Sequence, residues 1–286
     1  MRRLIINADD FGLTSGINHA IIEGHQKGVI TSATLMANSR AFDEAAAIAK
    51  SAPTLAIGCH VVLVDGTPVS APTDIPSLLG TNPTCFRGKL REFTRARAKL
   101  DQAQIELETT AQIRRIQAAG ITVTHLDSHK HTHMFRAVTA PVLRAAKACG
   151  VAAVRNPFEP AKFRFFKDRR ALWNRYFQVR TLHLLARRFK QQVRAARLHT
   201  TDGTIGIVAT GSLDQGLFSS LIENLPEGTW EFVCHPGYND ADLQKAGTRL
   251  LASRVQELEI LTSPQSRELL ERCGIELISY RDLGNS

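Results

Sequence analysis

Short apolar runs alternate along the chain with longer segments whose apolar residues recur at helical spacing. The runs are rich in β-branched residues, which favours buried strands, and they occur at residues 4–7, 32–36, 55–63, 121–127, 151–157, 203–208, 230–236 and 275–280. Helical periodicity occurs at residues 16–27, 42–50, 90–119, 137–149, 213–224, 248–257 and 264–273. Such an alternation predicts βα units arranged around a parallel sheet.

The number of predicted strands and the chain length together indicate one barrel. A chain of 286 residues permits either one α/β barrel, which typically takes about 250 residues, or two smaller domains. The strand count is six to eight, and no internal repeat or low-complexity tract divides the chain. We therefore expect an α/β fold, a single distorted (β/α) barrel domain over residues 1–286. Residues 65–88 and a basic stretch at about 160–200 are expected to be insertions.

Cysteine usage and the amino-terminal residues indicate a protein that stays in the cytoplasm. The five cysteines are scattered and show no CxxC spacing, so a disulfide framework is not expected. The chain begins with only a short apolar run before two aspartates, and no run reaches the ~18 residues of a membrane span.

The net charge of +9 is concentrated in one segment. Residues 162–197 hold twelve Lys or Arg against a single acid, Asp168, with aromatic and aliphatic residues between them. Read as a helix, this is a basic amphipathic element of the kind that lies on membranes, which suggests peripheral contact with the inner membrane face. The alternative is an outer barrel helix with its arginines in water. No nucleic-acid partner is expected, and a homodimer is left open.

Ionisable residues fall at the carboxyl ends of the predicted strands, the face on which barrel enzymes carry their active sites. These residues are Asp9, Asp10, His60, Asp127, His129, Arg155 and His235. Five strands contribute to the set, which makes coincidence a poor explanation.

The segment at residues 125–133, HLDSHKHTH, repeats His or Asp with period two. In an extended conformation all five side chains share one face, but a rise of ~3.3 Å per residue spreads them too far for one ion. One or two of them are therefore expected to be ligands. His129 is the best candidate because it lies just past the strand end, with His125 deeper in the barrel.

Two imidazoles and one carboxylate from different strands would form an open catalytic metal site. Taken singly, a histidine on an apolar strand, such as His125, is more often a hydrogen-bonded core residue. The Asp9-Asp10 pair could also cap the following helix, but capping needs one acid. With two, one carboxylate can bind the ion while the other acts as general base.

Five motifs in this order resemble the YdjC-like carbohydrate deacetylases. They are NADDFG (7–12), IGCHVVL (57–63), THLDSHKHTHM (124–134), VRNP (154–157) and EFVCHPGY (231–238). That family includes chitooligosaccharide deacetylases and deacetylases associated with hopanoid biosynthesis. VRNPFEP, LVDGTPV and the basic segment are more similar to the hopanoid-associated branch. The resemblance also implies a barrel related to the polysaccharide deacetylases.

Carried over by motif, the resemblance implies a role for each matching residue. Asp10, His60 and His129 would be the metal ligands. Asp9 would be the catalytic base and His235 the acid that protonates the departing amine. Arg155 would orient Asp9 or the substrate. Further residues expected to bind substrate or to support the ligands are Asp127, His131 and Tyr238.

The resulting hypothesis is a metal-dependent hydrolase that removes the N-acetyl group from an N-acetylglucosamine-containing substrate, either lipid-linked or a soluble oligomer. One divalent ion is expected, Mg²⁺ or Zn²⁺, with Mn²⁺ or Co²⁺ as alternatives. Two rivals remain. A metal-dependent phosphoesterase would usually need two ions and more carboxylates. A non-enzymatic basic protein on a barrel scaffold, binding nucleic acid or membrane, would tolerate loss of Asp9 or His60.

Overall fold

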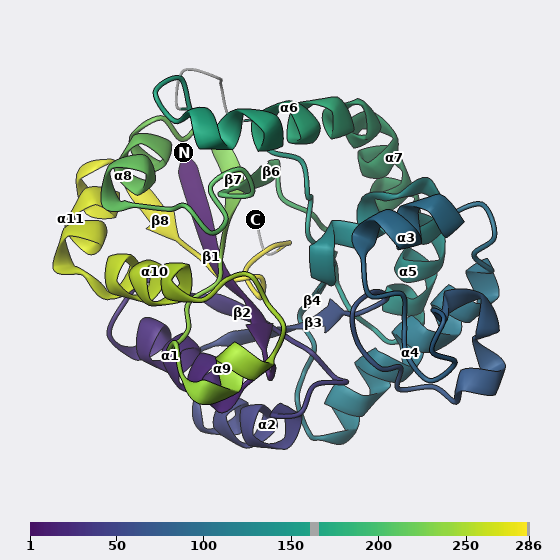
Figure 1. The fold of residues 1–286 in the computed structure, drawn as a ribbon. Helices are drawn as coiled ribbons and strands as arrows, with labels where there is room; N and C mark the ends of the chain where they lie inside the picture. Colours follow the sequence, from purple (N-terminus) through teal and green to yellow (C-terminus); the bar gives the residue numbers. More distant parts are fainter. Residues whose placement is uncertain (161–165, 285–286) are drawn as a thin grey trace.

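The computed structural model describes residues 1–160 and 166–284, and all strand pairs of its single sheet are parallel (Figure 1). The strands are β1 (Arg2–Phe11), β2 (Ser32–Leu35), β3 (Ala56–Val61), β4 (His125–Ser128), β5 (Ala153–Val154), β6 (Gly203–Ile205), β7 (Gly228–Cys234) and β8 (Ile275–Leu277). Their order is β5-β4-β3-β2-β1-β7-β6, and β8 pairs with β1. The expected α/β class is confirmed.

Strand β1 organises the sheet because it is the longest strand and pairs with three others. Along residues 2–8 it pairs with β7 on one edge. The other edge is shared, since β8 pairs with residues 2–4 and β2 with residues 7–11. The carboxyl end of β1, where the two aspartates lie, is therefore flanked by β7 and β2.

The sheet curls into an incomplete barrel whose two edge strands approach each other without regular pairing. Backbone hydrogen bonds bridge the gap. Val154 N donates to His199 O at 2.9 Å, and Thr204 N donates to Phe158 O at 3.3 Å. The gap accounts for the distortion expected of the barrel.

Helices surround the curled sheet (Figure 1). They are α1 (Ser15–Gln26), α2 (Phe42–Ser51), α3 (Leu90–Ala96), α4 (Gln102–Ala118), α5 (Arg136–Ala148), α6 (Trp173–Leu182), α7 (Ala186–Ala196), α8 (Gln215–Glu223), α9 (Ala241–Lys245), α10 (Ala252–Thr262) and α11 (Pro264–Arg272). The single helix expected at 90–119 is wrong. Asp101 starts α4 as an N-cap by accepting a hydrogen bond from Ala103 N at 2.8 Å, so the chain breaks before it.

The two segments expected to be insertions have different structures. Residues 65–88 contain two short 3₁₀ helices, η1 (Pro72–Asp74) and η2 (Pro76–Leu78). In the basic stretch, of which residues 161–165 lie outside the described residues, α7 buries Phe189 and Val193 and exposes most of its basic residues. For α7 this agrees with the outer-helix interpretation. That either segment is an insertion stays a prediction.

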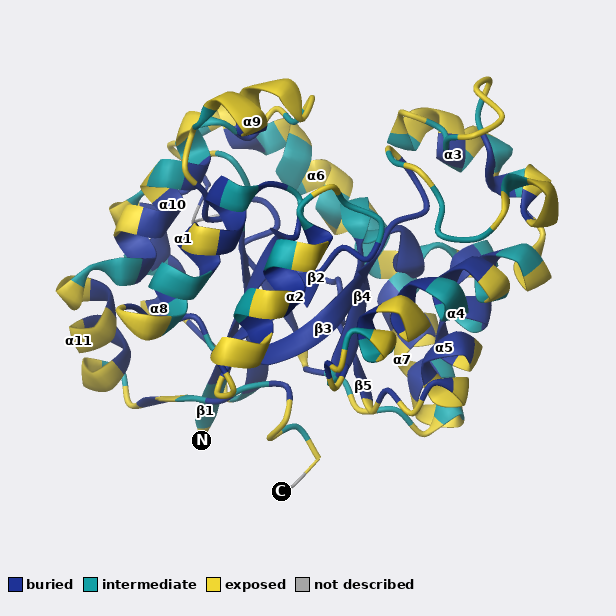
Figure 2. Ribbon diagram, turned by 90° about the horizontal axis from the view of Figure 1, so that it is seen from below, coloured by how far each residue is buried: buried dark blue, intermediate teal, exposed yellow. Residues whose placement is uncertain are grey.

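Burial follows the layers of the fold (Figure 2). Most strand residues are buried, and the longer helices other than α6 have a buried face towards the sheet and an exposed opposite face. The start of β1 lies at the lower end in this view, whereas α9 and α3 lie at the opposite end. Among the described residues no helix combines the length and the apolar character needed to cross a membrane.

Candidate metal and catalytic site

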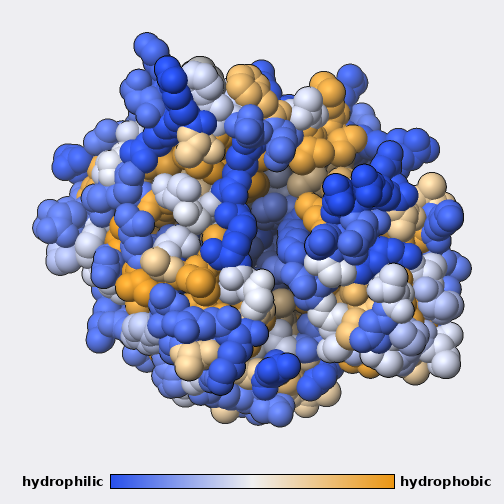
Figure 3. Space-filling model, viewed as in Figure 1, coloured by the Kyte–Doolittle hydropathy of each residue, from blue (hydrophilic) through white to orange (hydrophobic). Residues whose placement is uncertain are grey.

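Side chains that are distant in the sequence meet at the carboxyl end of the sheet. They line a hollow of about 490 Å³, and they include Asp9, Asp10, His60, His129, His131 and His235. Figure 3 looks into this end of the molecule, which is hollowed at its centre and bordered largely by hydrophilic residues. The expected gathering of strand-end residues is therefore present.

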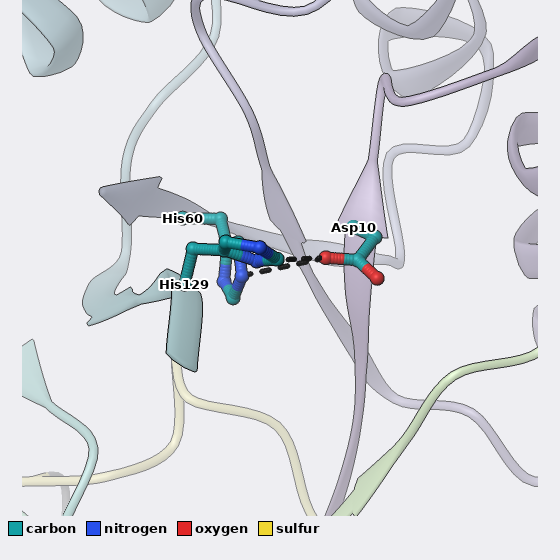
Figure 4. Close-up of side chains that lie close together, drawn as sticks. All are labelled: Asp10, His60 and His129. Carbon is teal, nitrogen blue, oxygen red and sulfur yellow. Dashed lines mark ion pairs between the residues drawn. The ribbon is translucent and has the colours of Figure 1, made fainter. Parts of the chain in front are cut away.

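Asp10, His60 and His129 form one compact cluster (Figure 4). Asp10 Oδ1 lies 3.5 Å from His60 Nε2 and 3.4 Å from His129 Nδ1. One ligand atom from each residue lies within 4.8 Å of the others. All three side chains point to a common centre from β1, β3 and the turn after β4.

These separations fit a single divalent ion. Two ligand atoms bound at about 2.1 Å in tetrahedral geometry lie about 3.4 Å apart, close to the distances from Asp10 to the two imidazoles. Two nitrogens and one oxygen also match the donor set of open catalytic zinc sites. The cluster can therefore hold an ion and leave positions for water and substrate.

The backbone of β1 explains how Asp9 and Asp10 both reach the hollow, although neighbouring strand residues normally face opposite sides. The β1–β2 register shifts between Ala8 and Phe11. Asp10 lies within that interval with φ of 66°, in the left-handed region that few non-glycine residues adopt. This irregularity places two adjacent carboxylates on one side.

The histidine-rich segment leaves the sheet after Ser128, so His129 lies just past the strand end, as the sequence predicted. The 3₁₀ segment η3 (His129–Met134) follows directly, and Lys130 and His131 have φ values of 55° and 53°. The turn presents His129 to the cluster. It directs His133 elsewhere, because Ser128 Oγ lies 2.6 Å from His133 Nδ1 in the core.

His125 is the core histidine that the sequence allowed for. It is fully buried, its Nε2 lies 3.0 Å from Asn7 Oδ1, and its ring stacks on Tyr280 with centroids 3.7 Å apart. Gly58 makes room for this ring, because a Cβ at that position would lie 2.5 Å from His125 Cε1. His125 therefore supports the barrel floor and is not a member of the three-residue cluster.

Asp127 orients His60. Its Oδ1 lies 2.7 Å from His60 Nδ1, so this pairing leaves Nε2 to face Asp10. Burial lowers the pKa of His60, but Asp127 and Asp9 outweigh burial and raise the pKa to about 9. Carboxylate–histidine pairs of this kind fix the tautomer and the direction of a metal-binding ring.

Arg155 clamps Asp9 from beneath the site. Its Nη1 and Nη2 donate to Asp9 Oδ2 and Oδ1 at 2.8 and 2.7 Å, and it also pairs with Asp127 and Glu231. Burial raises the pKa of Asp9, yet the charges of Arg155 and His60 outweigh it and hold the pKa well below its usual 3.8. Asp9 is consequently an ionised, oriented carboxylate.

His235 lies next to Asp9 at the rim of the hollow. Its Nε2 is 3.8 Å from Asp9 Oδ2, and its buried Nδ1 has no hydrogen-bond partner among the described residues. Burial lowers the pKa of His235 to about 4, although Asp9 and Asp10 raise it. The imidazole is therefore neutral at neutral pH before substrate binds.

Two further predicted residues differ in their placement. His131 lines the hollow, and its buried Nδ1 lacks a hydrogen-bond partner within the described part of the chain. Tyr238 does not line it. Its hydroxyl instead donates a hydrogen bond to Glu23 of α1, and 38% of the residue is exposed.

Helix α10 contributes two buried charged residues that sequence reasoning missed. Arg254 Nη2 donates to Asp10 Oδ2 at 2.5 Å, and Glu257 Oε2 accepts from the backbone N–H of His235 at 2.6 Å. They are three residues apart and share a helix face with Leu261, so charge at a core-facing position was the available signal. That signal was weak because a solvated helix face looks similar.

Comparison with known proteins agrees with the fold and identifies the family. A family profile described as "YdjC-like protein" matches residues 3–272. A carbohydrate deacetylase of Geobacillus stearothermophilus is 36% identical over 98% of both chains, and a chitooligosaccharide deacetylase of Escherichia fergusonii is 30% identical over 99% of both. A solved structure from Enterococcus faecalis V583, named as a candidate cellobiose-phosphate cleavage protein, shares 28% identity with a TM-score of 0.81 over 98% of both chains. With the profile matching nearly its whole length, the chain belongs to the YdjC-like protein family.

Proposed function

We propose that this protein is a metal-dependent carbohydrate deacetylase that hydrolyses the N-acetyl group of an amino sugar. The observation that carries the proposal is the cluster of Asp10, His60 and His129 beside an ionised Asp9 at the bottom of a hollow. Relatives named carbohydrate deacetylase and chitooligosaccharide deacetylase align over nearly the whole chain, which supports the same reaction class.

An ion held by the cluster would supply Lewis acidity that activates a water and polarises the amide carbonyl. Asp9 accepts the proton of the attacking water, and Arg155 keeps both of its oxygens oriented. As the C–N bond breaks, His235 delivers a proton to the leaving nitrogen, giving acetate and a free amine. Because the resting imidazole is neutral, His235 must acquire that proton during the reaction cycle.

The donor set favours Zn²⁺, because two imidazoles and one carboxylate are typical of catalytic zinc. Mg²⁺ prefers oxygen ligands and would need several waters here, while Mn²⁺ and Co²⁺ accept mixed donors. All four ions belong in the assay.

A second hollow of about 490 Å³ adjoins the first and shares Leu13, Met36, Asp65 and Ala246 with it. Asn38, Arg40, Lys245 and Asp242 are among its polar lining. Two adjoining hollows suit a substrate larger than one sugar ring, either an oligomer of N-acetylglucosamine or an amino sugar attached to an aglycone.

For the aglycone we propose a lipid, as in the hopanoid-associated deacetylases that VRNPFEP and LVDGTPV resemble. Phe177 of α6 and Leu184 of η6 (His183–Leu185) are 56% and 85% exposed. Basic residues such as Arg180 and Arg187 neighbour them in sequence, a combination suited to an anionic lipid surface. Sedimentation with anionic vesicles at low salt tests this contact, and absence of binding would refute it. Cytoplasmic location and a homodimer stay predictions.

Acetate release is the direct test of the reaction. The purified protein, stripped with chelator and reloaded with each ion, is assayed on N-acetylglucosamine oligomers of increasing length and on a lipid-linked N-acetylglucosamine. We expect acetate only from reloaded protein, and near-complete loss with Asp9→Asn or His60→Ala but not with the exposed His19→Ala. Acetate that persists in chelator, or phosphate release from a model ester without acetate, would contradict the proposal.

A further inference from the structure

The two oxygens of Asp10 have different partners. Oδ1 faces the imidazoles of His60 and His129 at 3.5 and 3.4 Å. Oδ2 accepts a hydrogen bond from Arg254 Nη2 at 2.5 Å. A carboxylate held in this way has one oxygen directed to the ion and the other engaged by a buried cation.

The guanidinium of Arg254 is itself fixed by the fold. Its Nε donates to Leu250 O at 3.2 Å, and its Nη1 lies 3.5 Å from His235 O. The residue is 1% exposed, and its own carbonyl accepts a hydrogen bond from Gly237 N at 3.2 Å. Arg254 thus ties α10, the loop after β7 and the end of β1 together, and cannot leave Asp10 without breaking several hydrogen bonds.

We propose that Arg254 is a positioning residue that restricts Asp10 to one metal-binding oxygen, Oδ1. A bidentate Asp10 with His60 and His129 would fill four positions, which closes a tetrahedral ion. With Oδ2 held by Arg254, the protein supplies three ligands and a fourth position stays open for water or substrate. The inference rests on the proposed metal dependence. It explains the open position by Arg254, a residue that does not itself bind the ion.

Glu257 extends the same arrangement to the other side of the site. It lies one turn after Arg254 on α10 and accepts the backbone N–H of His235 at 2.6 Å. The helix therefore holds both the Asp10 ligand and the main chain of His235. Any movement of α10 would displace the two together, which explains why buried charges occupy this helix face.

The test is metal binding by the whole chain, with Co²⁺ as the probe. Apo protein is titrated with Co²⁺, and its visible spectrum reports coordination geometry. With Arg254→Met we expect Co²⁺ affinity to fall by about 10–100-fold, the usual effect of removing a residue that supports a ligand. We also expect weaker visible absorption bands from Co²⁺ in this variant. Without Arg254, both oxygens of Asp10 can bind the ion, and this raises the coordination number of Co²⁺.

The controls distinguish a failure of this inference from misfolding and from a failure of the proposed function. Arg267→Met removes an exposed arginine of α11 whose guanidinium donates a hydrogen bond to Gly28 O, and should leave the Co²⁺ spectrum unchanged. If Arg254→Met does not fold, Arg254→Lys is titrated with Co²⁺ in its place. Lysine keeps the positive charge but cannot reproduce the planar, multiply donating guanidinium. Unaltered affinity and spectrum in the folded Arg254 variant would overturn the inference alone. Failure of the wild-type protein to bind Co²⁺, Zn²⁺, Mn²⁺ or Mg²⁺ would overturn it together with the metal-dependent function.

Discussion

Arg155 balances a cluster of buried carboxylates, and its replacement by Met gives the sharpest test of the site's electrostatics. The residue is fully buried, and its Nη2 lies 2.7 Å from Asp9 Oδ1 and 2.6 Å from Glu231 Oε1. Its Nη1 lies 2.5 Å from Asp127 Oδ2. Arg155→Met keeps most of the side-chain length and leaves three buried acids without their cation.

Removing one partner of a buried ion pair costs about 3–5 kcal/mol, because the remaining charge is desolvated and uncompensated. Three carboxylates depend on Arg155, so we expect the free energy of unfolding to fall by at least about 3–5 kcal/mol at neutral pH. The total stability of a domain is only about 5–15 kcal/mol. At about 2–4 °C per kcal/mol, the melting temperature should fall by roughly 6–20 °C.

The loss of unfolding free energy in Arg155→Met should depend on pH in a defined direction. In the wild-type protein the pKa of Asp9 lies below its unfolded value, so Asp9 stabilises the fold above that value and the contribution is lost in acid. In Arg155→Met the largest charge that opposes burial is gone, so the pKa of Asp9 rises. The penalty is therefore present at neutral pH and is relieved as the acid protonates. The stability difference between the two proteins should therefore narrow from pH 8 towards pH 5.

Urea unfolding of the metal-free proteins, followed by circular dichroism between pH 5 and 8, measures this difference. Arg144→Met is the matched control, because Arg144 pairs with Glu106 at 2.6 Å but both side chains are partly exposed. An exposed pair contributes less than about 1 kcal/mol. A loss in Arg155→Met no larger than in this control, or one that grows in acid, would refute the reasoning.

Three further predictions concern the site and its supports. In the metal-free protein Asp127 and Asp9 outweigh burial and raise the pKa of His60 to about 9, so a metal must displace a proton. Apparent metal affinity should rise about tenfold per pH unit up to that value, and calorimetry showing a flat affinity would contradict this. Glu108→Ala removes the acceptor of two backbone N–H groups of the loop at residues 69–70, at 2.9 and 2.8 Å. It should cost about 1–3 kcal/mol and speed amide exchange in that loop, and unchanged exchange would count against it. Gly58→Ala forces a Cβ against the ring of His125, so urea unfolding should show a loss of about 1–3 kcal/mol, and full stability would be inconsistent with the packing.

Much of the fold was predictable because its cause is local. Strands and helices follow from the period of apolar residues, and parallel strands end at one edge, so polar residues at those ends must lie near one another. On that basis Asp10, His60 and His129 were expected to meet, and the structure brings them together. Irregular backbone was not predictable, as the break before Asp101 and the left-handed residues after Ser128 demonstrate.

The sequence by itself determined the succession of strands and helices along the chain, the ionisable residues at the strand ends and the family. Only the tertiary structure decided which oxygen of Asp10 faces the histidines, because that depends on a left-handed φ and on Arg254, 244 residues away. It likewise turned Tyr238 towards Glu23 and brought Tyr280 under His125. Contacts between residues remote in sequence depend on how the curled sheet and its helices pack, and no local pattern encodes that packing.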